Sequence, residues 1–300
     1  MKTDKTEATN SSFDVLFSNS TYNQSVINNT ESYLLDDPKK FEREYTLKGN
    51  KLDISTVDKK AEISYLFEDA HTLNVTLESA WNSVKNIEVS SDSYGTLTIS
   101  NFVHVDINLG GDENSTLVIN NAKRGNITTS NGNDIITINA LTNNSNWSND
   151  FNIDTNAGDD IIGARGDKGI SNFYINSGTG NDTVTITGDY STATVNLGDG
   201  NDTIIGGTQG DLIDGGNGSD TIDYSSAING IIVNLDTEYA HNDGYGATDT
   251  LISVENVIGS DFDDDITGIH FIENILHGGD GNDTLRGLRG DDTLYGDNGD

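Results

Sequence analysis

Residues Gly278 to Asp300 read GGDGNDTLRGLRGDDTLYGDNGD, a stretch in which glycine, aspartate and one aliphatic residue recur every nine positions. The glycines before each aspartate allow positive φ values and therefore a tight turn. The aliphatic residue follows the aspartate by two positions, and on a short strand we expect it to point inward. This stretch therefore predicts a coil in which tight turns alternate with short strands.

The same unit recurs upstream in a looser form. Its shared aspartates are Asp134, Asp160, Asp182, Asp202, Asp211, Asp220, Asp264, Asp283 and Asp292. Each is followed two positions later by isoleucine, valine or leucine. No window carries a convincing helical period, so we expect an all-β protein.

The spacing between aspartates predicts the length of one coil. Asp202 and Asp220 are 18 residues apart, as are Asn274 and Asp292. Eighteen residues are two nonapeptides, which would make one complete coil with a strand on each side. Between Asp134 and Asp202 the successive spacings are 26, 22 and 20 residues, which predicts coils with a turn of this type on one side only.

Charge and composition limit the possible partners. The formal net charge of −33 repels nucleic-acid phosphates and anionic lipid head groups, so cations are the favoured partners. No apolar run approaches the length needed to cross a bilayer, and the N-terminal MKTDKTEATNSS does not resemble a conventional signal peptide. The absence of cysteine excludes disulfides, thiolate catalysis and cysteine zinc sites.

Glycine-rich, aspartate-rich turns suit a hard cation. Calcium takes about six to eight oxygen ligands, which backbone carbonyls and carboxylates supply without histidine or cysteine. One nonapeptide cannot complete such a shell. Stacked coils would share ions between their turns.

The repeats resemble the RTX, or haemolysin-type, calcium-binding family, whose signature is G-G-x-G-x-D-x-U-x. The best matches are Gly215–Asp223 (GGNGSDTID) and Gly278–Arg286 (GGDGNDTLR). The resemblance implies a right-handed parallel β-roll or β-helix, with calcium held in the turns by aspartate carboxylates and backbone carbonyls. It also implies type I secretion through a C-terminal signal, and hence a secreted or extracellular protein.

The resemblance implies that the glycines and aspartates of the turns bind several calcium ions (Ca2+). These residues are Gly198, Gly200, Asp202, Gly207, Asp211, Gly215, Gly216, Gly218, Asp220, Asp264, Gly278, Gly279, Gly281, Asp283, Gly290, Asp292, Asp134, Asp160 and Asp182. Ser115 stands at the aspartate position of an earlier turn and Asn274 at that of a later one. We therefore expect no complete calcium site at either position.

Composition and pattern divide the chain into four segments, and only two of its 33 glycines lie in the first hundred residues. Residues 1–50 are rich in Asn, Ser and Thr and are expected to be largely irregular. Residues 51–104 are expected to form a small β-rich region or an N-terminal cap of the coil. Residues 105–196 are predicted to form degenerate β-helix turns with partial calcium loops, and residues 197–300 the RTX β-roll, with a spacer at 224–258.

Catalytic motifs are absent from the sequence. The five histidines include no H-E-x-x-H pair, and no G-x-S-x-G elbow or P-loop lysine accompanies the glycines. The stretch DFDDD (261–265) resembles the start of an EF-hand loop, but Ile266 stands where that loop requires glycine. We therefore expect no enzyme activity.

These patterns predict a secreted calcium-binding repeat protein whose β-roll folds when calcium binds. One alternative is the non-catalytic part of a larger secreted RTX enzyme or toxin, because the last nonapeptide is incomplete and further repeats are expected to follow. A second alternative is a surface-layer or adhesin subunit that associates with itself or with a cell-surface partner. The lack of cysteine and the expected rod shape favour this alternative.

Overall fold

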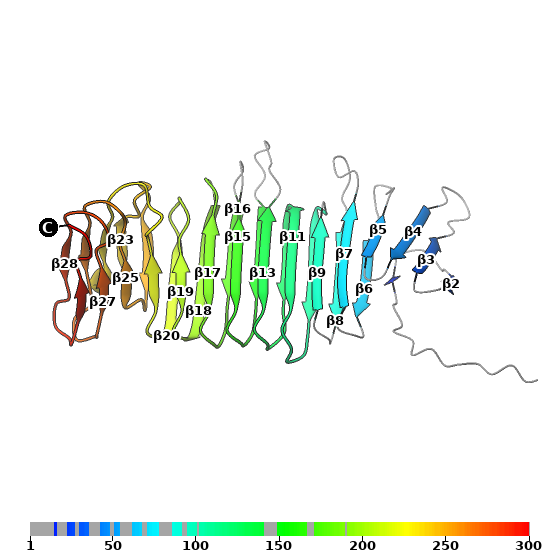
Figure 1. Ribbon diagram of the computed structural model, residues 1–300, viewed down its shortest axis with the longest axis horizontal. Coiled ribbons are helices and arrows are strands. Elements are labelled where there is room, and N and C mark those ends of the chain that lie inside the picture. The colour runs from blue at the N-terminus through cyan, green and yellow to red at the C-terminus, as the bar shows by residue number, and fades with distance from the viewer. Residues whose placement is uncertain are drawn as a thin grey trace, which may run out of the picture.

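The computed structural model describes residues 95–100, 102–140, 149–166, 171–189 and 191–299 with their side chains, and the backbone of the strands upstream. Its strands lie side by side along the long axis of a rod, from the N-terminal strands at one end to the C-terminal strands at the other (Figure 1). The described helical structure is one 3-10 turn, η1 (Leu235–Thr237). The prediction of an all-β fold is confirmed.

The strands form two sheets, which we call sheet A and sheet B. In spatial order, sheet A contains β1 (Val15–Leu16), β6 (Glu62–Phe67), β8 (Asn86–Ser91), β10 (His104–Leu109), β12 (Arg124–Thr128), β14 (Asn149–Asp154), β16 (Ser171–Asn176), β18 (Ser191–Gly200), β20 (Leu212–Gly218), β24 (Asp249–Ile252), β23 (Tyr239–Asn242), β22 (Ile232–Asn234), β26 (Asp265–Thr267) and β28 (Thr284–Arg286). Sheet B contains β2 (Asn23–Ile27), β3 (Thr30–Leu35), β4 (Arg43–Lys48), β5 (Lys51–Ile54), β7 (His71–Leu77), β9 (Gly95–Ser100), β11 (Thr116–Ala122), β13 (Ile135–Ala140), β15 (Ile161–Arg165), β17 (Thr183–Thr187), β19 (Thr203–Ile205), β21 (Thr221–Asp223), β25 (Asn256–Ile258), β27 (Ile275–His277) and β29 (Thr293–Tyr295).

Successive coils stack in parallel and in register, so each aliphatic residue lies on its counterpart. In sheet B, Ile136 pairs with Ile162, which pairs with Val184 and then with Ile204. Side chains of consecutive strand positions alternate between the two faces, so these residues point into the space between the sheets. All four are at most 1% exposed, which places the core in that space.

The core is wide in one part of the rod and narrow in another. In β17 both Val184 and Ile186 are buried, whereas the three residues of β19 bury only Ile204. We call the coils from β9 to β18 the wide coils and those from β19 to β29 the narrow coils. Phe151 and Phe173 stack with ring centroids 5.6 Å apart inside the wide coils.

The spacer interrupts the narrow coils within sheet A. Strands β22, β23 and β24 pair antiparallel, and β22 then pairs in parallel with β26. The coil continues without interruption in sheet B, where β21 pairs in parallel with β25. The spacer therefore adds strands to one sheet and leaves the stacking of the other unchanged.

The N-terminal third of the chain contributes strands to both sheets. Strands β1 to β4 fall within residues 1–50. Strands β2 to β5 pair antiparallel with their sequence neighbours. Such local pairing satisfies backbone hydrogen bonds without a strong apolar alternation. Strands β5 and β7 pair in parallel, as do β7 and β9, so residues 51–104 contain the first coils of the same stack.

Candidate metal sites

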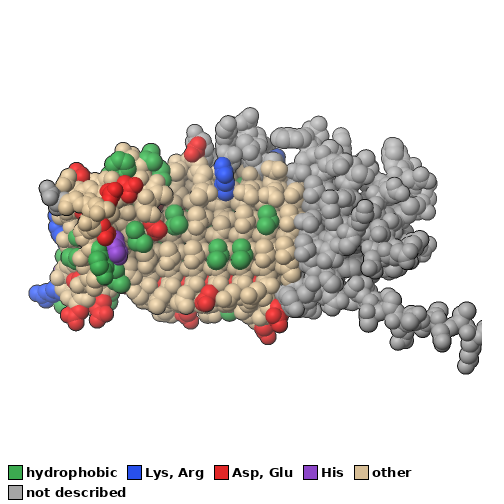
Figure 2. Space-filling model, viewed as in Figure 1, with side chains coloured by type: hydrophobic (Ala, Val, Ile, Leu, Met, Phe, Trp, Pro, Cys, Tyr) green, Lys and Arg blue, Asp and Glu red, His purple; other side chains and the backbone are tan. Residues whose placement is uncertain are grey.

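The turns lie along the two long edges of the rod. We call the turns that lead from sheet A to sheet B the first edge, and those that lead from sheet B to sheet A the second edge. Acidic side chains line the lower side of the rod in Figure 2. Exposed acidic residues in the first-edge turns include Asp112, Glu113, Asp159 and Asp199.

A column of buried aspartates runs inside the first edge. The backbone N–H of Asp160 donates to Oδ1 of Asp182 at 2.8 Å, and that of Asp182 donates to Oδ1 of Asp202 at 2.7 Å. The N–H of Asp202 donates in turn to Oδ1 of Asp220 at 2.8 Å. Each carboxylate therefore holds the backbone of the coil before it.

The column extends in both directions. Upstream, the N–H of Asp134 donates to Oδ1 of Asp160 at 2.7 Å. Downstream, the N–H of Asn274 donates to Oδ1 of Asp292 at 3.1 Å. The predicted coil length of 18 residues is thus the repeat that brings Asp202 to Asp220 and Asn274 to Asp292.

The second carboxylate oxygen of several aspartates lacks a partner. Among the described residues, Oδ2 is buried and accepts no hydrogen bond in Asp243 of the spacer and in five repeat aspartates: Asp160, Asp182, Asp202, Asp220 and Asp283. A buried charged oxygen without a partner is costly, by several kcal/mol for an ion in an apolar setting. A cation or a proton would stabilise each of the five oxygens of the repeat aspartates.

Without a cation, the protein environment favours the protonated acid. Burial, together with the neighbouring carboxylates of Asp182 and Asp134, raises the pKa of Asp160 to about 7. Burial likewise raises the pKa of Asp182 and of Asp220 to about 6. The column is therefore a set of carboxylates whose ionised forms need positive charge beside them.

The second and fourth residues of a turn must be glycine. Gly216 and Gly218 have φ values of 94° and 152°, in the region that residues with side chains rarely adopt. A Cβ on Gly216 would lie 2.1 Å from the carbonyl oxygen of Gly198, and a Cβ on Gly218 would lie 1.6 Å from that of Gly200. The turns therefore stack backbone on backbone and place carbonyl oxygens between the coils. Gly279 and Gly281 also have positive φ values, of 97° and 138°.

The first glycine of a turn makes room for its own aspartate. A Cβ on Gly215 would lie 2.6 Å from Oδ2 of Asp220, and a Cβ on Gly278 would lie 2.3 Å from Oδ2 of Asp283. The two consecutive glycines of the signature are therefore required for different reasons. One glycine admits the carboxylate, and the other allows the turn.

Three predicted ligands already have partners for both carboxylate oxygens. Asp211 accepts from the N–H of Ala193 at 2.7 Å and from the N–H of Gly207 at 3.0 Å. Asp264 accepts from Ile231 through one oxygen and from the N–H of Ser260 through the other. Asp134 accepts from Ser115 and, at both oxygens, from the hydroxyl of Ser130; its Oδ2–Oγ distance is 3.0 Å.

The remaining predicted residues lie at the first edge. Asp292 is half-buried, and a Cβ on Gly290 would lie 2.3 Å from the carbonyl oxygen of Ile272. Asn274 accepts at Oδ1 from Ile269 at 2.8 Å and donates from Nδ2 to the Glu255 carbonyl at 2.7 Å. Its turn is thus closed by hydrogen bonds, which explains how the coil continues where the repeat has no aspartate.

The structure adds acidic residues that the repeat pattern did not identify. Glu255 accepts the N–H of Asp220 at 2.9 Å and so continues the first-edge column. At the second edge, Asp249 accepts the N–H of Asp211 at 2.9 Å and the hydroxyl of Tyr224 at 2.8 Å. The signal for Asp249 was present in GYGATD (244–249), where one extra residue follows the second glycine.

Backbone oxygens must dominate any ion's shell. Across the part of the chain that the structure describes, no three histidine or carboxylate side chains converge as a metal cluster would require. The turns instead offer one carboxylate oxygen each beside stacked backbone carbonyls. This donor set contains only oxygen, which suits calcium better than zinc or copper.

Comparison with known families agrees with this donor set. Residues 195–229 and 273–300 match the RTX calcium-binding nonapeptide repeat, in four copies. No curated protein matches the chain. Within the described residues, no helix is long and apolar enough to cross a membrane.

The family match and the stacking of the strands together show that the chain carries RTX calcium-binding repeats, which form a parallel β-roll.

Proposed function

We propose that this protein binds several calcium ions between consecutive turns of its coil, and that this binding drives folding of the roll. The observation that supports the proposal is the set of buried, unpartnered Oδ2 atoms of Asp160, Asp182, Asp202, Asp220 and Asp283. Bound calcium supplies the positive charge that these oxygens lack. The glycine turns hold the backbone carbonyls of adjacent coils close enough to complete the shell.

In this proposal each aspartate has two roles, one in holding the backbone and one in binding the ion. Oδ1 of each carboxylate fixes the N–H of the preceding coil, and Oδ2 faces the ion. Removing the ion leaves like charges one coil apart, a repulsion of about 1 kcal/mol or more for each close pair even in water. Calcium that binds only to the folded coil therefore contributes its binding free energy to folding.

We propose an extracellular site of action, reached by type I secretion. RTX repeats are typical of extracellular proteins, and extracellular modules of this kind bind calcium with dissociation constants of about 0.1 to 1 mM. In a calcium-poor cytoplasm the chain would remain loose enough for export. It would then fold where calcium is abundant.

Titration calorimetry with calcium and with magnesium tests the proposal. We expect several calcium ions to bind, and magnesium to bind much more weakly because it demands a smaller octahedral shell. Far-UV circular dichroism in the same titration should report strand formation. Equal heats for the two ions, or binding without any gain of strand signal, would contradict the proposal.

A further inference from the structure

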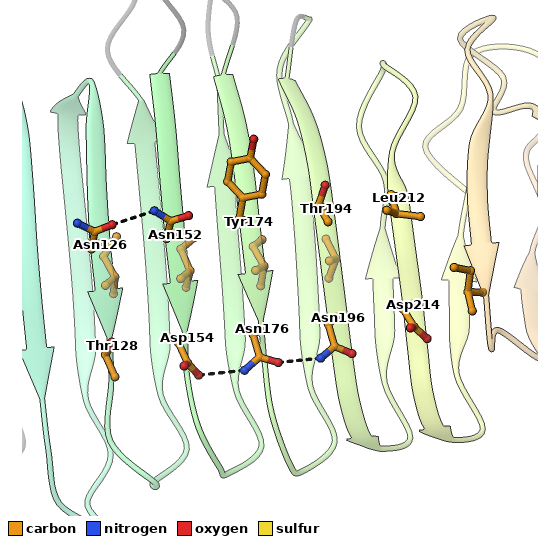
Figure 3. A pocket seen from close by; sticks show the side chains of 15 residues that line it. Asn126, Thr128, Asn152, Asp154, Tyr174, Asn176, Thr194, Asn196, Leu212 and Asp214 are labelled. Atoms are coloured by element: carbon orange, nitrogen blue, oxygen red, sulfur yellow. Dashed lines mark hydrogen bonds between the residues drawn. The ribbon is translucent and has the colours of Figure 1, made fainter.

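The outer face of sheet A carries a trough that the calcium sites do not use. It has a volume of about 500 Å³, crosses β12, β14, β16, β18 and β20, and reaches Ile252 at the end of β24 (Figure 3). Five strands spaced by about 4.8 Å give it a length of about 19 Å. The trough runs along the axis of the rod, across the strands.

Two rows of outward side chains form its sides. One row contains Asn126, Asn152, Tyr174, Thr194 and Leu212, each in register with the next. The other row contains Thr128, Asp154, Asn176, Asn196 and Asp214, two positions further along the same strands. The residues between the rows, such as Ile153 and Ile175, point into the core, so their backbone forms the floor.

Hydrogen bonds between coils fix the amides of both rows. Nδ2 of Asn176 donates to Oδ1 of Asp154 at 3.1 Å, and Nδ2 of Asn196 donates to Oδ1 of Asn176 at 2.9 Å. Nδ2 of Asn152 donates to Oδ1 of Asn126 at 2.8 Å. An amide has two N–H donors and two acceptor lone pairs. Each donating amide therefore keeps a second N–H, held in a fixed orientation, for a ligand.

Three outward side chains of the trough are apolar: Tyr174 and Leu212 in the first row, and Ile252, which follows Asp214 in the second row. Tyr174 is 47% exposed and Leu212 is 41% exposed, although both occupy an ordered strand of the sheet. Figure 3 shows Tyr174 and Leu212 in the same row, separated by Thr194. An exposed aromatic ring beside aligned donors and acceptors matches a ligand that has both apolar faces and many hydroxyl groups.

Charge decides between the classes of ligand. Among the described residues that line the trough, Asp154 and Asp214 are acidic and none is lysine, arginine or histidine. The trough therefore disfavours phosphates, nucleic acids and acidic polysaccharides. An added β-strand is also excluded, because each of the five strands is already hydrogen-bonded on both sides.

We propose that the trough binds an uncharged, linear glycan lying along the axis of the rod. The strand spacing of about 4.8 Å is close to the length of one sugar unit in an extended chain, so about four units would fit. The ring of Tyr174 would cover the C–H face of one sugar. The Asn176 and Asn196 amides would bond to hydroxyls of successive units.

Calorimetry on the full chain in saturating calcium tests this site. The neutral probes are cellopentaose, chitopentaose and mannopentaose, and the charged probe is an oligogalacturonate of the same length. We expect at least one neutral probe to bind with a dissociation constant on the order of 0.1 to 1 mM, and the galacturonate to bind at least tenfold more weakly. If no neutral probe binds, or if the galacturonate binds as well, the proposal is wrong.

Three variants locate the binding. Tyr174→Ala should weaken binding at least tenfold, whereas Tyr174→Phe should retain most of it because the ring remains. Tyr295→Ala is the matched control, since Tyr295 is 46% exposed but belongs to sheet B. Unchanged affinity in Tyr174→Ala would overturn the proposal.

Hydrogen exchange of the unmodified protein gives a test that does not depend on a variant folding. The bound glycan should slow exchange in β14, β16 and β18, and leave β13, β15 and β17 of sheet B unchanged. Slowing confined to sheet B or to the turns would place the ligand elsewhere and contradict the proposal.

Discussion

The wide and narrow coils stabilise the same architecture in different ways. A strand of the wide coils such as β17 buries Val184 and Ile186, whereas β19 in the narrow coils buries only Ile204. Each fully buried side chain of this kind contributes about 1.5 to 3 kcal/mol. A narrow coil therefore loses roughly half of the apolar stabilisation of a wide coil, while ordering nearly as many residues.

Aspartate-containing turns are more frequent in the narrow coils than in the wide coils. From Asp134 to Asp202 the repeated aspartates lie at the first edge only, whereas the narrow coils also have Asp211, Asp264 and Asp283 at the second edge. The density of carboxylate turns thus rises where the core narrows. Of these three second-edge aspartates, Asp211 and Asp264 have partners at both oxygens and only Asp283 has an unpartnered Oδ2. We therefore expect hydrogen bonds in the turns, together with bound ions, to offset the smaller apolar burial.

Calcium removal should have the largest effect and should separate the two regions. With a chelator, we expect exchange protection to fall by two orders of magnitude or more in β27 and β28, and much less in β13 and β15. The reason is that the narrow coils lack enough core to balance charge repulsion. Hydrogen exchange with mass spectrometry measures both regions in one sample, and an equal loss in both would contradict the comparison.

Acid should partly replace calcium. Burial raises the pKa of Asp211 to about 7 and of Asp220 to about 6, whereas an unfolded aspartate has a pKa of about 3.9. The calcium-free folded state then binds more protons than the unfolded state, so the stability from these groups is full below about pH 4 and is lost as the pH rises to about 7.

Urea unfolding of the calcium-free protein at pH 5.5 and pH 7.5 measures this effect. We expect the higher midpoint at pH 5.5. In saturating calcium the trend should weaken or reverse, because protons compete with the ion for the same oxygens. A calcium-free midpoint that rises with pH would refute the assignment of these buried carboxylates.

A core truncation should matter more to calcium dependence in a narrow coil. Ile213→Ala removes the one buried side chain of Leu212–Asp214, whereas Ile175→Ala leaves Phe173 buried in the same strand. Either change should cost about 2 to 5 kcal/mol locally. We expect only Ile213→Ala to raise the calcium midpoint of folding severalfold, as followed by circular dichroism. Equal midpoints would indicate that core width does not set calcium dependence.

The smallest expected effect is the loss of one charge in the column. Asp220→Asn keeps an oxygen for the N–H of Asp202 but removes the carboxylate charge, so the calcium midpoint should rise up to about tenfold, which is about 1.4 kcal/mol. Asp189→Asn is the control, because Asp189 is exposed in a second-edge turn. Calcium titration of both variants should show a change in Asp220→Asn alone; an equal shift would indicate a general charge effect.

The spacing of the repeats was enough to predict the coil length, and the glycine-aspartate signature was enough to show the resemblance to the RTX family, which implied the parallel roll. The turn requires positive φ, which glycine adopts without strain, and the aliphatic residue two positions after the aspartate must point inward. Few other residue types would therefore fit at Gly216, Asp220 and Ile222. These are local requirements, and local requirements can be read from one chain. The assignment of individual calcium ligands remains a prediction.

Only the tertiary structure showed which aspartate oxygens have partners, that Glu255 belongs to the column, and that the trough exists. The sequence treats Asp134 and Asp182 alike, but the hydroxyl of Ser130 satisfies both oxygens of Asp134, while Oδ2 of Asp182 is left without a partner. Glu255 lies outside the repeat pattern, yet it accepts the N–H of Asp220 from a position 35 residues later. The trough likewise exists only because parallel register aligns Asn152 with Tyr174 and Thr194. The Glu255 contact and the trough join residues about one coil apart or more, whereas Ser130 and Asp134 lie four residues apart in one turn. The number of residues in each coil is fixed by loops and by a spacer whose lengths no local rule determines.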